Sequence, residues 1–101
     1  MPSRLPTTAL LGFTEEALHN LSLHNLNEDL SHDMREWLND LWFAFYNYPE
    51  ATEHMRALTG HISAMYRACE EKRLEDAEQK RLATLPHIGS LYNIAARHQL
   101  P

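Results

Sequence analysis

The stretch Met34–Tyr48, MREWLNDLWFAFYNY, decides the fold because it concentrates the large aromatic side chains. It holds both Trp residues, two of the three Phe residues and two of the four Tyr residues. Read as a helix, it places six apolar side chains on one face, at spacings of three and four residues: Met34, Trp37, Leu38, Leu41, Phe45 and Tyr48. We predict a helix that begins after a cap at Asn27 or Ser31 and ends near Asn47.

Three further aromatic residues of this helix, Trp42, Phe43 and Tyr46, point away from the apolar face. The helix is therefore apolar over more than half of its circumference. Large aromatic side chains dominate both protein cores and protein interfaces. Such a helix is either central to the domain or partly committed to another chain, and the sequence leaves both interpretations open.

The next helix starts at Pro49, which disfavours helical geometry at Tyr48 and suits a first helical position. Its apolar residues repeat at spacings of 4, 3, 4, 3 and 4, the pattern of an a/d seam: Ala51, Met55, Leu58, Ile62, Met65 and Cys69. The seam is short for an autonomous coiled coil. It predicts either antiparallel packing inside this chain or contact with a partner helix.

The charged segment EEKRLEDAEQKR, residues 70–81, favours helix by composition and by ion-pair spacing. We predict one helix from Pro49 to Thr84, stopped by Leu85–Pro86, and a last short helix over 87–99. At 1.5 Å per residue the long helix would measure about 54 Å, whereas a compact domain of this size spans only about 34 Å. One end must project, bend or be buried by a second copy.

The predicted fold class is all-α: a bundle of three to five helices, one of them long, forming a dimer. Residues 1–12 are expected to be a flexible N-terminal arm, and residues 13–101 a single helical domain. Thr14 is the predicted cap of the first helix, with Phe13 and Leu18 at staple positions, and Asn-rich sequence predicts a break near His24 to Asn27. A chain of 101 residues buries only about 60–68% of its surface, so self-association is a natural supplement to its core.

Charge and cysteine usage limit the classes of function. The formal net charge is −5, and residues 14–53 carry nine acids against Arg35 alone. Binding of duplex nucleic acid requires a basic stripe, so nucleic acid is not the expected primary ligand. Cys69 is the single cysteine, which fits a reducing compartment, and the opening residues lack a signal-peptide core. We expect a soluble, cytoplasmic protein.

Seven histidines invite a metal interpretation. The set His24, Glu28 and His32 needs a helix that the predicted break interrupts, and His54 and His61 lie two turns apart, too far for one ion to bridge. We expect no metal and no cofactor. Cys69 with His61 is the nearest approach to a nucleophile and base, but Cys69 lies on the apolar seam, so we expect no enzymatic activity.

The leading hypothesis is a small helical regulatory or adaptor protein that binds another protein and inhibits or sequesters it. An antiactivator of a transcription regulator, a secretion chaperone and a phage-type inhibitor all fit, and the protein is expected to form a homodimer. The candidate interface residues are Trp37, Trp42, Phe43, Tyr46, Met55, Leu58, Ile62, Met65 and Cys69. The alternative is direct nucleic-acid binding through basic residues of the C-terminal half: Arg67, Lys72, Arg73, Lys80, Arg81 and Arg97.

Overall fold

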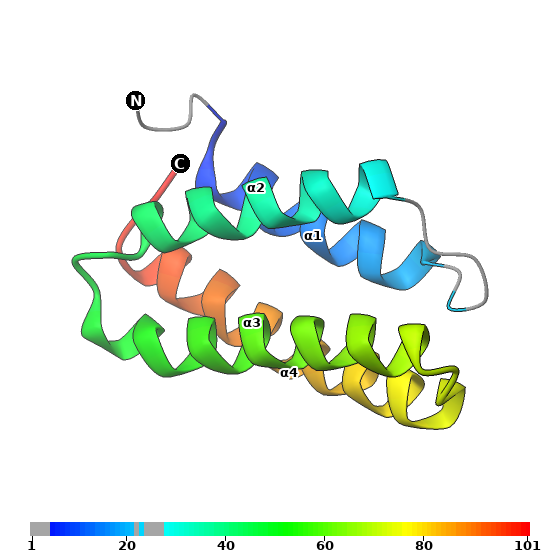
Figure 1. The fold of residues 1–101 in the computed structure, drawn as a ribbon. Coiled ribbons are helices and arrows are strands. Elements are labelled where there is room, and N and C mark those ends of the chain that lie inside the picture. The colour runs from blue at the N-terminus through cyan, green and yellow to red at the C-terminus, as the bar shows by residue number, and fades with distance from the viewer. Residues whose placement is uncertain (1–4, 22, 24–27) are drawn as a thin grey trace.

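The computed structural model describes residues 5–21, 23 and 28–101, and within these residues the chain is all-α (Figure 1). Its helices are α1 (Thr7–Asn20), α2 (Glu28–Ala44), α3 (Pro49–Glu70) and α4 (Leu74–Arg97). The described part contains no β-strand. The predicted all-α bundle is therefore confirmed.

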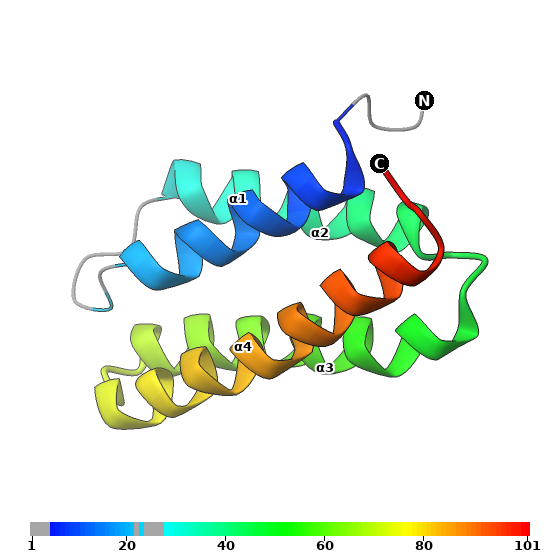
Figure 2. The same cartoon turned by 180° about the vertical axis from the view of Figure 1, so that it is seen from behind.

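The helices form two antiparallel hairpins, α1–α2 and α3–α4, stacked as two layers (Figures 1 and 2). The most extensive helix contact joins α3 to α4, α1 contacts both α2 and α4, and α2 and α3 touch over only a small area. The bundle measures 40 × 23 × 18 Å. The core therefore lies between the layers, and the side between α2 and α3 is the least closed.

The apolar face predicted for the stretch Met34–Tyr48 does fill the core, although α2 ends at Ala44, before the predicted end near Asn47. Met34, Leu38, Leu41 and Phe45 are at most 8% exposed. Trp37 and Tyr48 are partly buried against the same cluster. The face matches the prediction because residues three and four apart share one side of a helix.

The seam of α3 packs inside the chain, which decides between the two interpretations of its heptad pattern. Five predicted seam residues are buried: Ala51, Met55, Leu58, Ile62 and Met65. The last buried seam position is Ala68, whereas Cys69 is only partly buried. The a/d spacing here reflects packing against α4, not a coiled coil with a second chain.

The first helix starts earlier than predicted. α1 begins at Thr7, directly after Pro6, so it includes residues 7–12. Thr14 is buried mid-helix, and its hydroxyl donates a hydrogen bond to the Leu10 carbonyl at 2.8 Å. The predicted Thr14 cap is therefore wrong. The predicted break near His24 to Asn27 and the possible Asn27 cap lie outside the described residues, and Ser31 lies inside α2.

The predicted helix from Pro49 to Thr84 is wrong because the chain reverses at residues 71–73. Lys72 adopts a left-handed conformation, with φ of 60°. Its amide donates to the Cys69 carbonyl at 3.0 Å, and the Arg73 amide donates to the Ala68 carbonyl at 2.8 Å. These two bonds make the Schellman motif that ends many helices. The reversal lets α4 fold back along α3, so the bundle stays compact.

Pro86 does not stop a helix, contrary to prediction, and lies inside α4. Proline removes the hydrogen bond to the carbonyl four residues earlier, that of Leu82. Pro86 is exposed and Leu82 is 50% exposed, so this carbonyl lies on the solvent-exposed side of the helix. Water can solvate it there, and α4 runs on to Arg97 as one helix instead of two.

Polar contacts bind the C-terminal residues of the described chain to the first turns of α3 and α1. Glu50, in the first turn of α3, accepts hydrogen bonds from Arg97 at 2.7 Å and from His98, both at the end of α4. The Thr8 amide of α1 donates to the Pro101 carbonyl at 3.1 Å. Separately, none of the described helices is long and apolar enough to cross a membrane.

Candidate functional site

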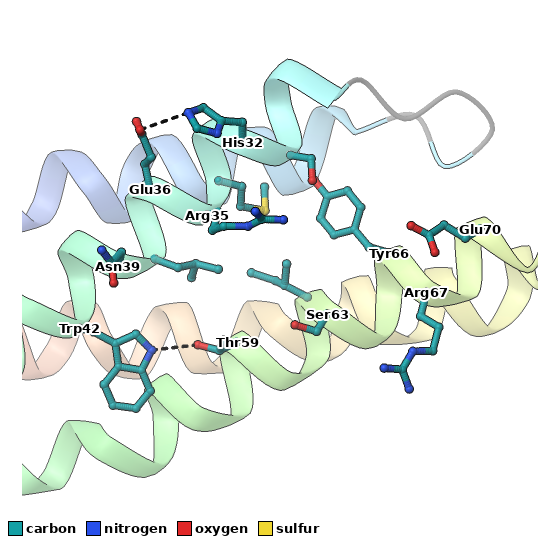
Figure 3. Close-up of a pocket in the computed structure, with 14 residues that line it drawn as sticks. His32, Arg35, Glu36, Asn39, Trp42, Thr59, Ser63, Tyr66, Arg67 and Glu70 are labelled. Carbon is teal, nitrogen blue, oxygen red and sulfur yellow. Dashed lines mark hydrogen bonds and ion pairs between the residues drawn. The ribbon is translucent and has the colours of Figure 1, made fainter.

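A groove of about 750 Å³ runs between α2 and α3 (Figure 3). Eight lining residues come from α2 and six from α3, spanning Ser31 to Trp42 and Thr59 to Glu70. The groove exists because α2 is held by α1 and α3 is held by α4, which leaves the facing sides of α2 and α3 mostly apart. The site is thus a consequence of how the two hairpins stack.

The floor of the groove is the outer edge of the hydrophobic core. Met34 and Leu38 reach it from α2, and Ile62 reaches it from α3. These side chains are 1%, 8% and 4% exposed respectively. The floor therefore exposes only the edges of these core side chains, and an apolar group that enters the groove contacts those edges together with the ring of Trp42.

One end of the groove is bridged by a hydrogen bond between its two walls. The indole Nε1 of Trp42 donates to the Thr59 hydroxyl at 3.2 Å (Figure 3). That hydroxyl in turn donates to the Met55 carbonyl at 2.7 Å. The hydrogen bond holds the Nε1 edge of the Trp42 ring against α3, and Trp42 also lines the groove.

Tyr66 of α3 lies toward the other end of the groove (Figure 3), and its phenol is close to the Ser31 hydroxyl of α2. Burial raises the pKa of the Tyr66 phenol, and the nearby Ser31 hydroxyl lowers it to a smaller extent. Although the two hydroxyls lie close, the buried Tyr66 oxygen has no hydrogen-bond partner of normal geometry among the described residues. Its burial leaves this oxygen out of reach of a ligand in the groove.

The rims of the groove carry charges of both signs. On the α2 rim lie Arg35 and Glu36, and Glu36 pairs with His32 at 3.2 Å. On the α3 rim lie Arg67 and Glu70. Each rim therefore balances one arginine against one glutamate, and the groove favours neither a strongly acidic nor a strongly basic ligand.

The structure brings only two of the predicted interface residues, Trp42 and Ile62, into the groove. Met55, Leu58 and Met65 are 0% exposed and belong to the core of this chain, which leaves them no free surface to offer. The remaining four candidates lie elsewhere.

Trp37 lies on the α1 side of α2, where its ring is 5.8 Å from that of Phe13. Cys69 is partly buried, and burial raises the pKa of its thiol. Phe43 and Tyr46 are 70% and 80% exposed. Phe43 follows the lining residue Asn39 by one helical turn, so its ring extends the α2 rim beyond the groove.

Sequence reasoning missed the polar wall of α3, made of Thr59, Ser63 and Tyr66. Their spacing of three and four residues runs parallel to the buried seam and marks a second stripe on the same helix. This stripe of small polar residues beside the buried seam, ending in a tyrosine, was the sequence signal that could have indicated the α3 wall of the groove.

Comparisons with known proteins identified no relative of this chain. No protein-family model, no curated protein and no solved structure matches the chain.

Proposed function

We propose that the protein is a small helical adaptor or inhibitor of another protein. It binds that partner by accepting one of the partner's amphipathic helices in the groove between α2 and α3. The observation that carries this proposal is the groove itself, with an apolar floor between two polar rims. An amphipathic helix laid in an apolar groove is a recurring mode of protein recognition. Sequestering such a helix is one way to inhibit the protein that owns it.

The dimensions of the groove support a helix as the occupant. Its lining spans eleven residue steps along each wall, from Ser31 to Trp42 and from Thr59 to Glu70, or about 16 Å at 1.5 Å per residue. This length matches about three helical turns of a ligand. The balanced charges on the rims complement a helix whose polar flanks carry both signs.

The structure gives less support to nucleic-acid binding by the basic residues of the C-terminal half. Arg73 pairs with Glu71 and Asp76, and Arg97 pairs with Glu50. Arg81 pairs with Glu78 and donates to the Leu18 carbonyl at 3.1 Å. These three arginines form ion pairs within the chain, and the acids beside them reduce the positive charge that a phosphate-binding stripe needs.

A designed peptide tests the proposal without knowledge of the natural partner. The probe is a 14-residue helix with leucine at positions of one face and alternating lysine and glutamate on its flanks (~20 Å long). Amide chemical shifts of the isotope-labelled protein should change along residues 31–42 and 59–70. A peptide of the same composition with two central proline substitutions should bind more weakly, because it cannot form the helix.

Ser63→Trp places a bulky ring in the groove wall and should weaken peptide binding by at least about tenfold, or 1.4 kcal/mol. The matched control is Asn93→Trp, at an exposed position of α4. Equal affinities of the two variants, or shift changes centred outside the groove, would show that the groove is not the docking site.

A further inference from the structure

Three histidines that are distant in sequence meet on the face formed by α3 and α4. The ring of His87 from α4 lies 5.3 Å from that of His54 and 5.8 Å from that of His61, both on α3. The Nδ1 atoms of His54 and His87 are only 3.1 Å apart. The sequence separates His54 from His61 by two helical turns, and α4 supplies the ring between them.

We propose that His54 and His87 bind a divalent transition-metal ion, Cu²⁺ or Ni²⁺, through their Nδ1 atoms. This pair lies on the α3–α4 face and not in the groove, so the inference is independent of the proposed function. A metal bound there would join α3 to α4 through one side chain from the second turn of α3 and one from the middle of α4.

The separation of the two nitrogens indicates which metals fit. Two nitrogens 3.1 Å apart, each about 2.0–2.1 Å from a shared ion, subtend an angle of roughly 95–100° at that ion. This angle is close to the right angle between neighbouring ligands in square-planar and octahedral sites. Cu²⁺ and Ni²⁺ prefer such tetragonal sites, whereas Zn²⁺ prefers a tetrahedral one.

The three histidines are accessible to a metal ion. Their rings are all partly exposed, so an ion can reach them from solvent. An imidazole ligates a metal through the ring nitrogen that carries no proton.

The pair would supply two protein ligands and no more. No group of three or more His, Cys, Asp or Glu side chains is arranged to hold a metal in the part of the chain that the structure describes. The other coordination positions would be filled by water. This limits the affinity and makes the two imidazoles decisive for binding.

Titration with Cu²⁺ at neutral pH, in the presence of glycine as a weak competing chelator, tests the proposal. Electron paramagnetic resonance of the wild-type protein should show one Cu²⁺ ion with imidazole nitrogens as ligands. His54→Gln and His87→Gln should each weaken binding by more than about tenfold, since even loss of a supporting outer-shell partner costs that much. The control is His32→Gln, an exposed histidine of α2, which should bind as wild type does.

Ni²⁺ supplies a second readout that does not depend on the spectrum. It should raise the thermal unfolding midpoint of the wild type and of His32→Gln, because a ligand that binds the folded state stabilises it, and should not raise that of His54→Gln. Wild-type Cu²⁺ affinity in both His54→Gln and His87→Gln would overturn the proposal. So would a loss confined to His61→Gln, which would leave the 3.1 Å pair as an ordinary hydrogen bond.

Discussion

The indole of Trp42 and the hydroxyl of Thr59 join α2 to α3 at a distance of 3.2 Å. Because Thr59 also donates to the Met55 carbonyl of its own helix, its hydroxyl is oriented to accept from the indole. This relay sets the distance between the two walls at the bridged end of the groove. Both the stability of the bundle and the shape of the groove depend on it.

Trp42→Phe removes the hydrogen bond and keeps an aromatic ring. It should lower the free energy of unfolding by about 1 kcal/mol, the usual net contribution of one such bond plus a small loss of packing. Urea denaturation measures it. Thr59→Val should have a similar effect, and the double variant should lose less than the sum of the two. Strictly additive losses would show that the bond contributes nothing.

Phe43 and Phe45 make a matched pair two residues apart. Phe45 is 2% exposed and Phe43 is 70% exposed. Phe45→Ala should cost about 3–5 kcal/mol because it opens a cavity in the core, whereas Phe43→Ala should change the unfolding free energy of the monomer by no more than about 0.5 kcal/mol. Thermal and chemical denaturation measure both. A large loss in Phe43→Ala at concentrations where the protein is monomeric would mean that this ring packs against its own chain.

The same variant addresses the expected homodimer. We expect the exposed rings of Phe43 and Tyr46 to contribute to self-association, since aromatic residues are common hot spots of interfaces. Sedimentation of Phe43→Ala beside the wild type measures this, and the variant should shift toward monomer. A wild-type protein that sediments as a monomer would contradict the expected homodimer.

Lys72→Gly should stabilise the protein. A residue with a side chain pays about 1–2 kcal/mol in the left-handed conformation, and glycine avoids that cost while losing part of the gain to its greater freedom in the unfolded chain. We expect a net gain of about 0.5–1 kcal/mol. The control, Lys80→Gly in the interior of α4, should instead cost about 1 kcal/mol. Destabilisation by both would contradict the conformation of Lys72.

Glu50 predicts an acid dependence. The hydrogen bond from His98 and the charge of Arg97 lower the pKa of Glu50 below its ordinary value of 4.5. Its contribution to stability is therefore complete above pH 4.5 and is lost as the pH falls through the lower folded pKa. In Glu50→Gln, the unfolding free energy should depend less steeply on pH in this range. Glu53→Gln is the neighbouring control, and an equal change in both variants would exclude a specific role for Glu50.

The core was predictable where one physical rule acted alone. Burial of an apolar stripe places Met34 and Leu41 of α2 inside, and it does the same for Met55 and Leu58 of α3. The turn at Lys72 was not predictable from local signals, since the residue is not glycine and the surrounding composition favours helix. At this turn, the packing of α4 against α3 outweighs the helix propensity of the local sequence.

The candidate site was harder to predict because it arises between elements. Trp42 was identified as an aromatic off the main stripe, but its bond to Thr59 depends on how two hairpins stack. The contact of His87 with His54 depends on the reversal at residues 71–73 and on the passage of α4 through Pro86. No spacing within one helix encodes either relationship.

The small contact area between α2 and α3 has a kinetic consequence. α3 and α4 are adjacent in sequence and share the most extensive contact of the bundle, so their hairpin can form early at little cost in loop closure. α2 is held mainly by α1. Local opening should therefore expose the backbone amides of α2 to hydrogen exchange before those of α3, and the groove would be bordered by a mobile wall and a fixed one.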